Sequence, residues 1–281
     1  MHVTRHADPD TFLAAVAPMQ DRGEASASLF AGWAHAMKRT PPPPDEHVYL
    51  ATCIESGSCG AAVQRGESPA IVGQSDAAAA AAFAEDLARD WPALQGVVGA
   101  LVACEAFARR WRDLTGRPHA LRFSLRQHAL TAIADVPGAA GAPRVAGEAD
   151  IPWLVAKQLA FVAEVGMRDS PERIRALLPV RVAGGDFRIW DDRRPVALAG
   201  FNDAAPDFAR IAPVYTLPDC RGRGYATALV ASLSRELLAR GKRKLFLTTD
   251  VANPTSNAIY TRIGYRPESD EYHFDFVDPE D

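Results

Sequence analysis

The chain has 281 residues, a formal net charge of −4 and 48% hydrophobic residues. This length fits two domains of ordinary size, and the apolar share is typical of a globular protein. The negative charge argues against nucleic acid or an anionic membrane as the main partner. The N-terminus is polar, and no run approaches the roughly 18 apolar residues of a spanning helix, so we predict a cytoplasmic protein without a signal peptide.

Cysteine and histidine usage indicates neither disulfides nor a metal site. The four cysteines are Cys53, Cys59, Cys104 and Cys220. They form no CxxC pair, so reduced, mostly buried thiols are the better interpretation. Cys220 would act as a nucleophile only with a base that the sequence does not place. His2 and His6 stand four apart near a chain end, where chains usually fray, and we predict no metal.

The first half reads as an alternation of helices and strands. Helical patterns lie within residues 8–38 and stop before the proline run 41–44. Further helices are predicted from Asp76 and over residues 104–114. The predicted strands are two within residues 47–65 around a Ser-Gly-Ser turn, then 70–74, 96–100 and 119–130.

The second half repeats this order after a stretch rich in Gly, Pro and Ala. We therefore divide the chain into a first domain at residues 1–135, a linker at 136–150 and a second domain at 151–281. The elements predicted around and after this boundary are helices at 150–165, capped by Asp150, and 171–178, a hairpin of Phe187–Trp190 and Val196–Phe201, and a closing strand Tyr272–Phe276. The match in order indicates an internal repeat of fold.

The most specific pattern is a strand, a glycine turn and a helix in the second domain. The predicted strand Ile211–Thr216 leads into a turn in which Gly222 and Gly224 let the backbone approach a ligand closely. The next helix points its free N–H groups at the same place, and Arg221 and Arg223 add positive charge. A diphosphate is the natural occupant of such an anion site.

A second motif follows this helix. Lys244–Thr249 reads as a buried strand, and Asn253, followed by Pro, suits the N-cap of another helix. Gly264 suits the end of that helix. Asn253, Ser256 and Tyr260 fall at i, i+3 and i+7, so they share one face.

Two other nucleotide-binding motifs fit less well. A lone Gly-x-Gly between a strand and a helix is often only a tight turn. A dinucleotide fingerprint needs a third Gly where Thr227 stands and an acidic residue about 20 positions on. A P-loop needs Gly-Lys-Ser/Thr after the turn. The glycine turn together with the Asn/Ser/Tyr helix is more specific than either half.

These motifs resemble the GCN5-related N-acetyltransferases, the GNAT superfamily. The residues that carry the resemblance are VYTLP at 214–218, RGRGYA at 221–226, and Asn253, Ser256, Tyr260, Gly264 and Tyr265. The resemblance implies an α/β fold with two GNAT-like domains in tandem. Each would be a mixed, mostly antiparallel twisted sheet with a splayed central strand pair and helices on both faces.

The resemblance also implies roles for single residues. In the family, the strand and the Asn contact the pantetheine of acetyl-CoA, the turn holds the pyrophosphate, and the Tyr stands near the thioester sulfur. Carried over, the cofactor-binding residues are Val214, Tyr215, Thr216, Arg221, Gly222, Arg223, Gly224, Tyr225, Ala226 and Asn253, and the catalytic residue is Tyr260. Asp219 stands where the family usually has Gln or Arg, and a carboxylate beside a diphosphate is unfavourable unless it faces away.

The first half lacks the glycine turn. Gln74, Ser75 and Asp76 hold its place, with neither flexibility nor positive charge, and an acidic side chain repels phosphate. The first half therefore resembles a degenerate GNAT domain that has lost its cofactor site.

We therefore predict an acetyl-CoA-dependent N-acetyltransferase that moves the acetyl group to a primary amine of a small molecule by direct attack. Tyr260 would protonate the leaving thiolate. The general base stays open among Asp250, Glu164, Tyr215 and a water relay. The alternatives are a non-catalytic acyl-CoA-binding sensor or scaffold, and an acyltransferase for a protein amine. The sequence leaves the acceptor, the acyl-chain preference and the oligomeric state open.

Overall fold

The structure is a computed structural model that describes residues 1–18, 24–55, 58–73, 75–167, 170–205 and 207–277. The chain forms two compact units. Unit 1 comprises Met1–Gln127, Thr249–Ala252 and Glu268–Asp281, and unit 2 comprises His128–Thr248 and Asn253–Pro267. The chain therefore returns to unit 1 twice after entering unit 2. None of the described helices is both long and apolar enough to span a membrane.

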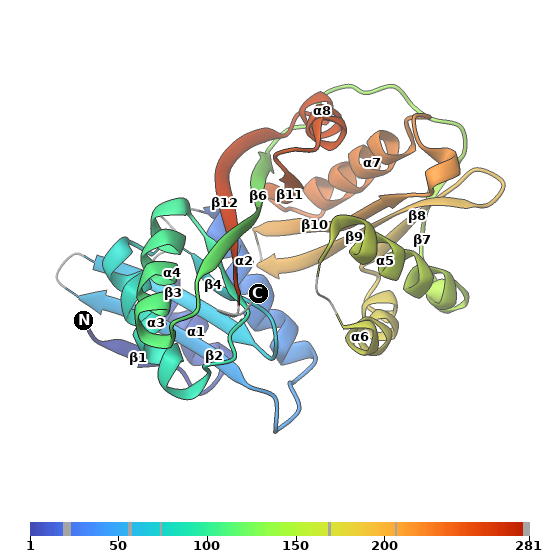
Figure 1. The fold of residues 1–281 in the computed structure, drawn as a ribbon. Coiled ribbons are helices and arrows are strands. Elements are labelled where there is room, and N and C mark those ends of the chain that lie inside the picture. The colour runs from blue at the N-terminus through green and yellow to red at the C-terminus, as the bar shows by residue number, and fades with distance from the viewer. Residues whose placement is uncertain (19–23, 56–57, 74, 168–169, 206, 278–281) are drawn as a thin grey trace. The chain divides into compact units, whose positions relative to one another are not determined.

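Unit 1 is a sheet covered by helices (Figure 1). Its helices are α1 (Pro9–Val16), α2 (Glu24–Arg39), α3 (Ala77–Asp90) and α4 (Leu101–Thr115). Its strands are β1 (Val3–Arg5), β2 (Val48–Glu55), β3 (Ser58–Arg65), β4 (Ala70–Gly73), β5 (Gly96–Gly99) and most of β6 (His119–Leu130) and β12 (Arg266–Phe276). They lie in the order β1-β2-β3-β4-β5-β12-β6, with β4 and β5 parallel.

Alternate residues of the unit 1 strands face two separate cores. Tyr49 and Ala51 of β2 belong to a cluster that includes Phe107 of α4. Leu50, which stands between them, belongs to another cluster that includes Phe12 of α1. Successive side chains of a strand point to opposite faces, so helices cover both faces of this sheet.

Unit 2 has the same architecture. Its helices are α5 (Ile151–Val165), α6 (Pro171–Ala183), α7 (Tyr225–Ala239) and α8 (Pro254–Ile263). Its strands are β7 (Ala142–Val145), β8 (Phe187–Asp191), β9 (Pro195–Ala205), β10 (Phe208–Thr216) and most of β11 (Lys244–Asp250), in the order β11-β10-β9-β8-β7. Figure 1 shows α7 and α8 on one side of these strands and α5 and α6 on the other. The predicted fold class is confirmed.

Strand β10 leaves its parallel neighbour partway along. The ladder to β11 joins Phe208, Ala209 and Arg210 to Lys244, Leu245 and Phe246. Among the described residues no β11 partner follows, whereas the antiparallel ladder to β9 continues as far as Thr216 and Ala197. The second half of β10 is therefore splayed from β11, and its backbone groups on that side are left for another partner.

Each unit also begins with a strand that the sequence pattern did not predict. β1 pairs antiparallel with β2, and β7 pairs antiparallel with β8. Each precedes a pair of helices, so the internal repeat is longer by one strand than expected. β7 lies within residues 136–150, which the sequence analysis assigned to a linker. Three of its four residues are exposed, so β7 lacks the alternation of apolar and polar residues that predicts a strand.

Two helices of unit 2 differ in detail from the prediction. Asp150 stands at the N-cap position of α5 as predicted, but its side chain makes no capping hydrogen bond, because its backbone is already helical and its carboxylate accepts a hydrogen bond from Gly147 N at 2.8 Å. Arg144 Nη1 also lies 2.6 Å from Asp150 Oδ2 and forms an ion pair with this carboxylate. The second helix, α6, continues to Ala183 and contains Pro179, although proline removes a helical hydrogen bond.

Residues 143–281 expressed without the first half are expected to aggregate. Strand β12 belongs mostly to unit 1, where it pairs with β5 from Tyr272 opposite Gly99 to Asp275 opposite Gly96. The Phe276 ring stacks on the Trp111 ring, with 5.2 Å between the ring centres. In the fragment these strand edges and rings would lie in water, where unpaired edges promote association. Size-exclusion chromatography checks this, with residues 143–267 as the matched shorter fragment. A monodisperse, folded fragment 143–281 would contradict it.

Candidate active site

The turn between β10 and α7 presents a helix N-terminus without a side-chain cap. Gly222 and Gly224 have φ angles of 76° and 81°, in the left-handed region that favours glycine. A Cβ built on either glycine would meet nothing within 4 Å, so the space before the turn is open. Gly224 is the N-cap residue of α7 and offers no side-chain oxygen to it. The first N–H groups of α7 are thus suited to donating to an anion.

Asp219, the departure from the family pattern, is paired with a cation. Its carboxylate accepts a hydrogen bond from Arg194, which lies in the turn between β8 and β9. This pairing lowers the pKa of Asp219, so the carboxylate is ionised at neutral pH and its charge is balanced. Arg223 Nη2 donates to the Asp219 carbonyl oxygen at 3.2 Å and braces the same turn. The acidic residue therefore does not have to face a bound phosphate without compensation.

Arg221 connects the glycine turn to strand β10 and helix α5. Its Nε donates to Thr216 O at 3.2 Å, and its Nη2 lies 2.7 Å from Glu164 Oε2 at the end of α5. The guanidinium also lies 5.5 Å from the centre of the Tyr215 ring. The side chains of Arg221 and Glu164 are 45% and 47% exposed, so this ion pair stabilises the protein by only about 0–1 kcal/mol. A phosphate group can therefore compete with Glu164 for Arg221.

Tyr225 anchors the first turn of α7. Its ring is 4% exposed, and its hydroxyl donates to Asp192 Oδ2 at 2.5 Å. This hydrogen bond raises the pKa of Tyr225, so the phenol stays neutral. The hydroxyl is thus engaged, whereas the backbone N–H of Tyr225 belongs to the uncapped first turn of α7.

The splayed part of β10 contains Val214, Tyr215 and Thr216. Thr216 Oγ1 is shielded from solvent and has no hydrogen-bond partner among the described residues. Buried hydroxyl groups usually have a hydrogen-bond partner, so a ligand group at this position would satisfy the Thr216 hydroxyl. Tyr215 is 8% exposed, and Phe161 of α5 meets its ring edge-on at 6.4 Å.

Asn253 caps α8 as predicted. Its Oδ1 accepts a hydrogen bond from Ser256 N at 3.0 Å, and its carbonyl oxygen accepts one from Asn257 Nδ2 at 2.7 Å. The capping bond fixes the side-chain amide, and its N–H₂ group is not used in this bond. Gly264 ends the helix in the left-handed conformation, with φ 115°.

Tyr260 lies two turns along α8 and is 8% exposed. Its ring packs against Tyr265 at 6.0 Å and His128 at 6.5 Å. No hydrogen bond of its hydroxyl is present among the described residues, and burial alone raises its pKa. Tyr260 is therefore a neutral hydroxyl donor that the surrounding protein does not use.

The site combines an open glycine turn, a splayed strand, an Asn that caps α8 and a neutral buried Tyr within one unit. The acetyltransferase (GNAT) family model matches residues 160–265, which include all of these elements. Residues 160–265 are a GNAT acetyltransferase domain. The resemblance stated from the sequence is thereby confirmed, and the chain is an acyltransferase. No match was found among curated proteins.

Solved structures extend the likeness to the whole chain. A Drosophila protein has a TM-score of 0.65 at 16% identity, covering 98% of each chain. A GCN5-related N-acetyltransferase from Sphaerobacter thermophilus has a TM-score of 0.63 at 15% identity, covering 99% of this chain and 96% of its own. A tandem GNAT protein from the clavulanic acid biosynthesis pathway has a TM-score of 0.60 at 14% identity, covering 100% and 99%. At these identities the likeness shows a shared tandem GNAT fold.

The three candidate bases have different surroundings. Glu164 is paired with Arg221, which lies in the glycine turn. Tyr215 is buried beneath the same guanidinium. Asp250 belongs to the segment Thr249–Ala252 of unit 1, and its Oδ1 accepts a hydrogen bond from Ala252 N at 2.8 Å. The choice among these groups and a water relay stays a prediction. The described residues contain no cluster of His, Cys, Asp or Glu that could hold a metal ion.

In the GNAT-like unit 1, a side chain caps the N-terminus of α3, whereas the N-terminus of α7 in unit 2 has no side-chain cap. Asp76 caps α3 and accepts hydrogen bonds from Ala79 N at 2.9 Å and Cys59 N at 3.2 Å. Its carboxylate thus occupies donors that an anion would need. The predicted turn also included Gln74, which lies outside the described residues.

Two residues that support the site were not predicted from the sequence. Asp192 and Arg194 hold Tyr225 and Asp219 from the turn between β8 and β9. The run of four charged residues at 191–194 was a signal, but it does not say which charges pair.

Replacing Glu164 by Gln should tighten acetyl-CoA binding to this GNAT domain. The substitution frees Arg221 for the diphosphate and removes a negative charge beside it, so the dissociation constant should fall about two- to five-fold. Isothermal titration at low salt measures this, and the difference should shrink at high salt because exposed charges are screened. Glu172→Gln on α6 is the matched control. Weaker binding by the Glu164 variant would show that Glu164 positions Arg221 for the ligand.

Proposed function

We propose that unit 2 transfers the acetyl group of acetyl-CoA to a primary amine of a small molecule within a ternary complex. The observation that carries this proposal is the junction of β10 and α7. There a strand edge without a β11 partner leads directly into an open glycine turn at a helix N-terminus. CoA has an extended amide-bearing arm and a diphosphate, which are the groups that such a junction can bind.

The chain offers a partner for each part of this substrate. Backbone groups of Val214 to Thr216 would bind the pantetheine amides, together with the Asn253 side-chain N–H₂ group. The diphosphate would lie on the turn, held by the backbone of residues 222–226 and the Arg221 guanidinium. Acetyl-CoA supplies the activated thioester carbonyl. Binding on a fixed strand edge holds the acetyl group in one orientation, which favours attack by a bound amine.

The proposed proton transfers involve a backbone N–H of β10, the Tyr260 hydroxyl and one of the candidate bases. A backbone N–H of the splayed part of β10 would stabilise the negative charge that develops on the thioester oxygen. Tyr260 would donate its hydroxyl proton to the departing thiolate, since no hydrogen bond to another described residue holds that hydroxyl. The attacking amine loses a proton to one of the candidate bases or to water.

Unit 1 is proposed to bind no cofactor. Asp76 fills the helix N-terminus that would face a diphosphate, and β4 ends at Gly73, one residue after its ladder to β5, so it offers no long splayed edge like that of β10. We also propose the cytoplasm as the compartment, because the four cysteines are free thiols.

Release of free thiol from acetyl-CoA across a panel of amines tests the proposed function. Amine-dependent thiol release by the full chain, and its loss in Gly222→Val, is the expected result. Binding of acetyl-CoA without release for any small amine would favour a non-catalytic binder. Release only with a peptide or protein amine would favour a protein acetyltransferase.

A further inference from the structure

Unit 1 contains an apolar pocket beside the C-terminal end of its second helix, α2. Seven of its nine lining residues are apolar, and the other two are His6 and Lys38. The apolar lining comes from the start of α1, the end of α2, the loop after it and strand β2, and includes Pro9, Met37, Pro41, Pro42, Val48 and Leu50. The volume is about 360 Å³, within the range of roughly 300–1,000 Å³ that is usual for small-molecule sites.

The loop between α2 and β2 forms one wall of this pocket. It spans residues 40–47, whereas only residues 184–186 join α6 to β8 in unit 2. The additional length contains the proline run 41–44, of which Pro41 and Pro42 line the pocket. Proline fixes its own φ angle, so this wall has few conformations to lose when a ligand binds.

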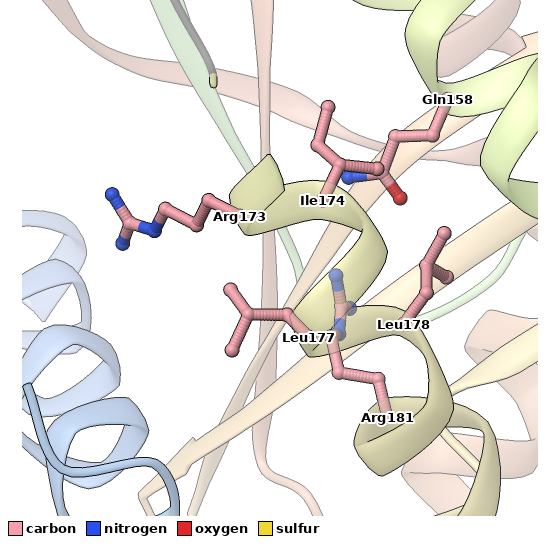
Figure 2. Close-up of a pocket in the computed structure, with 6 residues that line it drawn as sticks. All are labelled: Gln158, Arg173, Ile174, Leu177, Leu178 and Arg181. Atoms are coloured by element: carbon pink, nitrogen blue, oxygen red, sulfur yellow. The ribbon is translucent and has the colours of Figure 1, made fainter. Parts of the chain in front are cut away.

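A guanidinium group takes the matching place in unit 2. Arg181 precedes the last residue of α6 by two positions, as Met37 precedes the last residue of α2. Arg181 Nε lies 3.5 Å from Asp186 Oδ2, and the guanidinium lies 4.5 Å from the centre of the Phe187 ring at the start of β8. The pocket that Arg181 lines together with five other side chains has a volume of about 120 Å³ (Figure 2). An apolar side chain and a longer loop thus distinguish the larger pocket of unit 1.

The two polar residues of the unit 1 pocket bring no unbalanced charge. Lys38 Nζ lies 2.6 Å from Asp10 Oδ1, so its charge is balanced. Burial lowers the pKa of His6, so its ring is neutral at neutral pH. His6 Nε2 lies 2.9 Å from Thr52 Oγ1, and its Nδ1 makes no hydrogen bond to another described residue. One neutral ring nitrogen is therefore left for a ligand, as donor or acceptor according to the tautomer.

These surroundings favour an uncharged ligand with an apolar body. A charged group would lose its hydration here and find no unpaired opposite charge among the described lining residues. Asp10 would repel a carboxylate, and Lys38 would repel an ammonium group. An apolar ring gains by leaving water, and proline rings pack well against aromatic rings.

We propose that this pocket of unit 1 binds a small, uncharged aromatic molecule whose one polar group forms a hydrogen bond with His6 Nδ1. The site belongs to the unit that is proposed to bind no cofactor. It does not depend on the proposed acetyltransferase function, because ligand binding is read without turnover.

Three naphthalene compounds test the ligand class by equilibrium dialysis with the full chain. 2-Naphthol, whose hydroxyl stays protonated at neutral pH, should bind at one site per chain with a Kd below about 1 mM. Naphthalene should bind about 2- to 10-fold more weakly, because it lacks the hydrogen bond. 2-Naphthoate should bind at least about 10-fold more weakly, because its charge loses hydration. No binding of 2-naphthol, or equal binding of 2-naphthoate, would overturn the proposal.

Two substitutions locate the site. Ala7 is an exposed lining residue, so Ala7→Trp should fill the pocket and abolish 2-naphthol binding. Asp45→Trp is the matched control, because Asp45 is exposed in the proline loop and is not among the lining residues. Undiminished binding in a folded Ala7→Trp variant would place the ligand elsewhere and overturn the assignment.

His6→Phe tests the hydrogen bond. Phe keeps a ring against Phe12, which His6 meets edge-on at 5.8 Å between ring centres, and removes both ring nitrogens. The affinity for 2-naphthol should fall to that for naphthalene, whereas the affinity for naphthalene should stay unchanged. Melting temperatures verify folding. An unaltered preference for 2-naphthol would refute the role of His6.

Discussion

Replacing Tyr260 by Phe should lower turnover by about 10²- to 10⁴-fold, the usual contribution of a positioned acid, and leave acetyl-CoA affinity nearly unchanged. The ring packs against Tyr265 and His128, and Phe keeps those contacts. The hydroxyl makes no hydrogen bond to another described residue, so its removal leaves no buried group unsatisfied. The melting temperature should therefore stay close to that of the unaltered protein.

The relative acidities of the Tyr260 phenol and the CoA thiol determine how Tyr260 can act. A thiol with a pKa of about 8.5 is a stronger acid than a phenol with a pKa of about 10 or above, so full transfer to a solvated thiolate costs about 2 kcal/mol or more. Burial raises the pKa of Tyr260 and would also raise that of a thiol leaving into the same surroundings. Tyr260 is therefore expected to donate a hydrogen bond as negative charge develops on sulfur, completing the transfer as the thiolate departs.

Tyr265→Phe is the matched control for this experiment. Tyr265 is fully buried beside Tyr260, but its hydroxyl lies 2.9 Å from Ser234 Oγ and is already used. Its loss should lower the melting temperature and change kcat little. Full turnover in Tyr260→Phe would show that water or another donor serves the thiolate, and Tyr260 would then be a packing residue.

Replacing Gly222 by Val should abolish acetyl-CoA binding. The turn places Gly222 at φ 76°, which a β-branched residue adopts only with strain of about 1–2 kcal/mol. The new side chain would also project into the open space where the diphosphate is proposed to bind. Strain and blockage act together, so titration should detect no binding and thiol release should stop.

Gly241→Val separates these two effects. Gly241 follows α7, has φ 95°, and likewise would meet nothing within 4 Å of an added Cβ. Both substitutions should lower the melting temperature by similar amounts, because both impose a left-handed conformation on valine. Only the Gly222 variant should lose acetyl-CoA. Retained affinity in Gly222→Val would place the diphosphate elsewhere.

The sequence predicted the parts of the site whose residues are neighbours in the chain. The strand, glycine turn and helix follow one another directly from β10 to α7, so their spacing reveals their geometry. The cap at Asn253 and the left-handed Gly264 are local as well, and both are confirmed. Such features depend on backbone conformation over a few residues, which residue type largely decides.

Pairings between distant residues could not be read in this way. Arg194 and Asp219 are separated by 25 positions, and Glu164 and Arg221 by 57. A one-dimensional pattern shows that charges exist but not which ones meet. The placement of β12 beside β5 was hidden for a similar reason, because the alternation of a strand is the same whichever neighbour it pairs with.

Calorimetric titration of the full chain with acetyl-CoA tests the central claim most directly. An open glycine turn lies in unit 2, at Gly222 and Gly224, whereas Asp76 fills the helix N-terminus in unit 1. We therefore predict a stoichiometry of one acetyl-CoA per chain, lost completely in Gly222→Val and kept in Gly241→Val. Two equivalent sites, or one site that survives Gly222→Val, would contradict it.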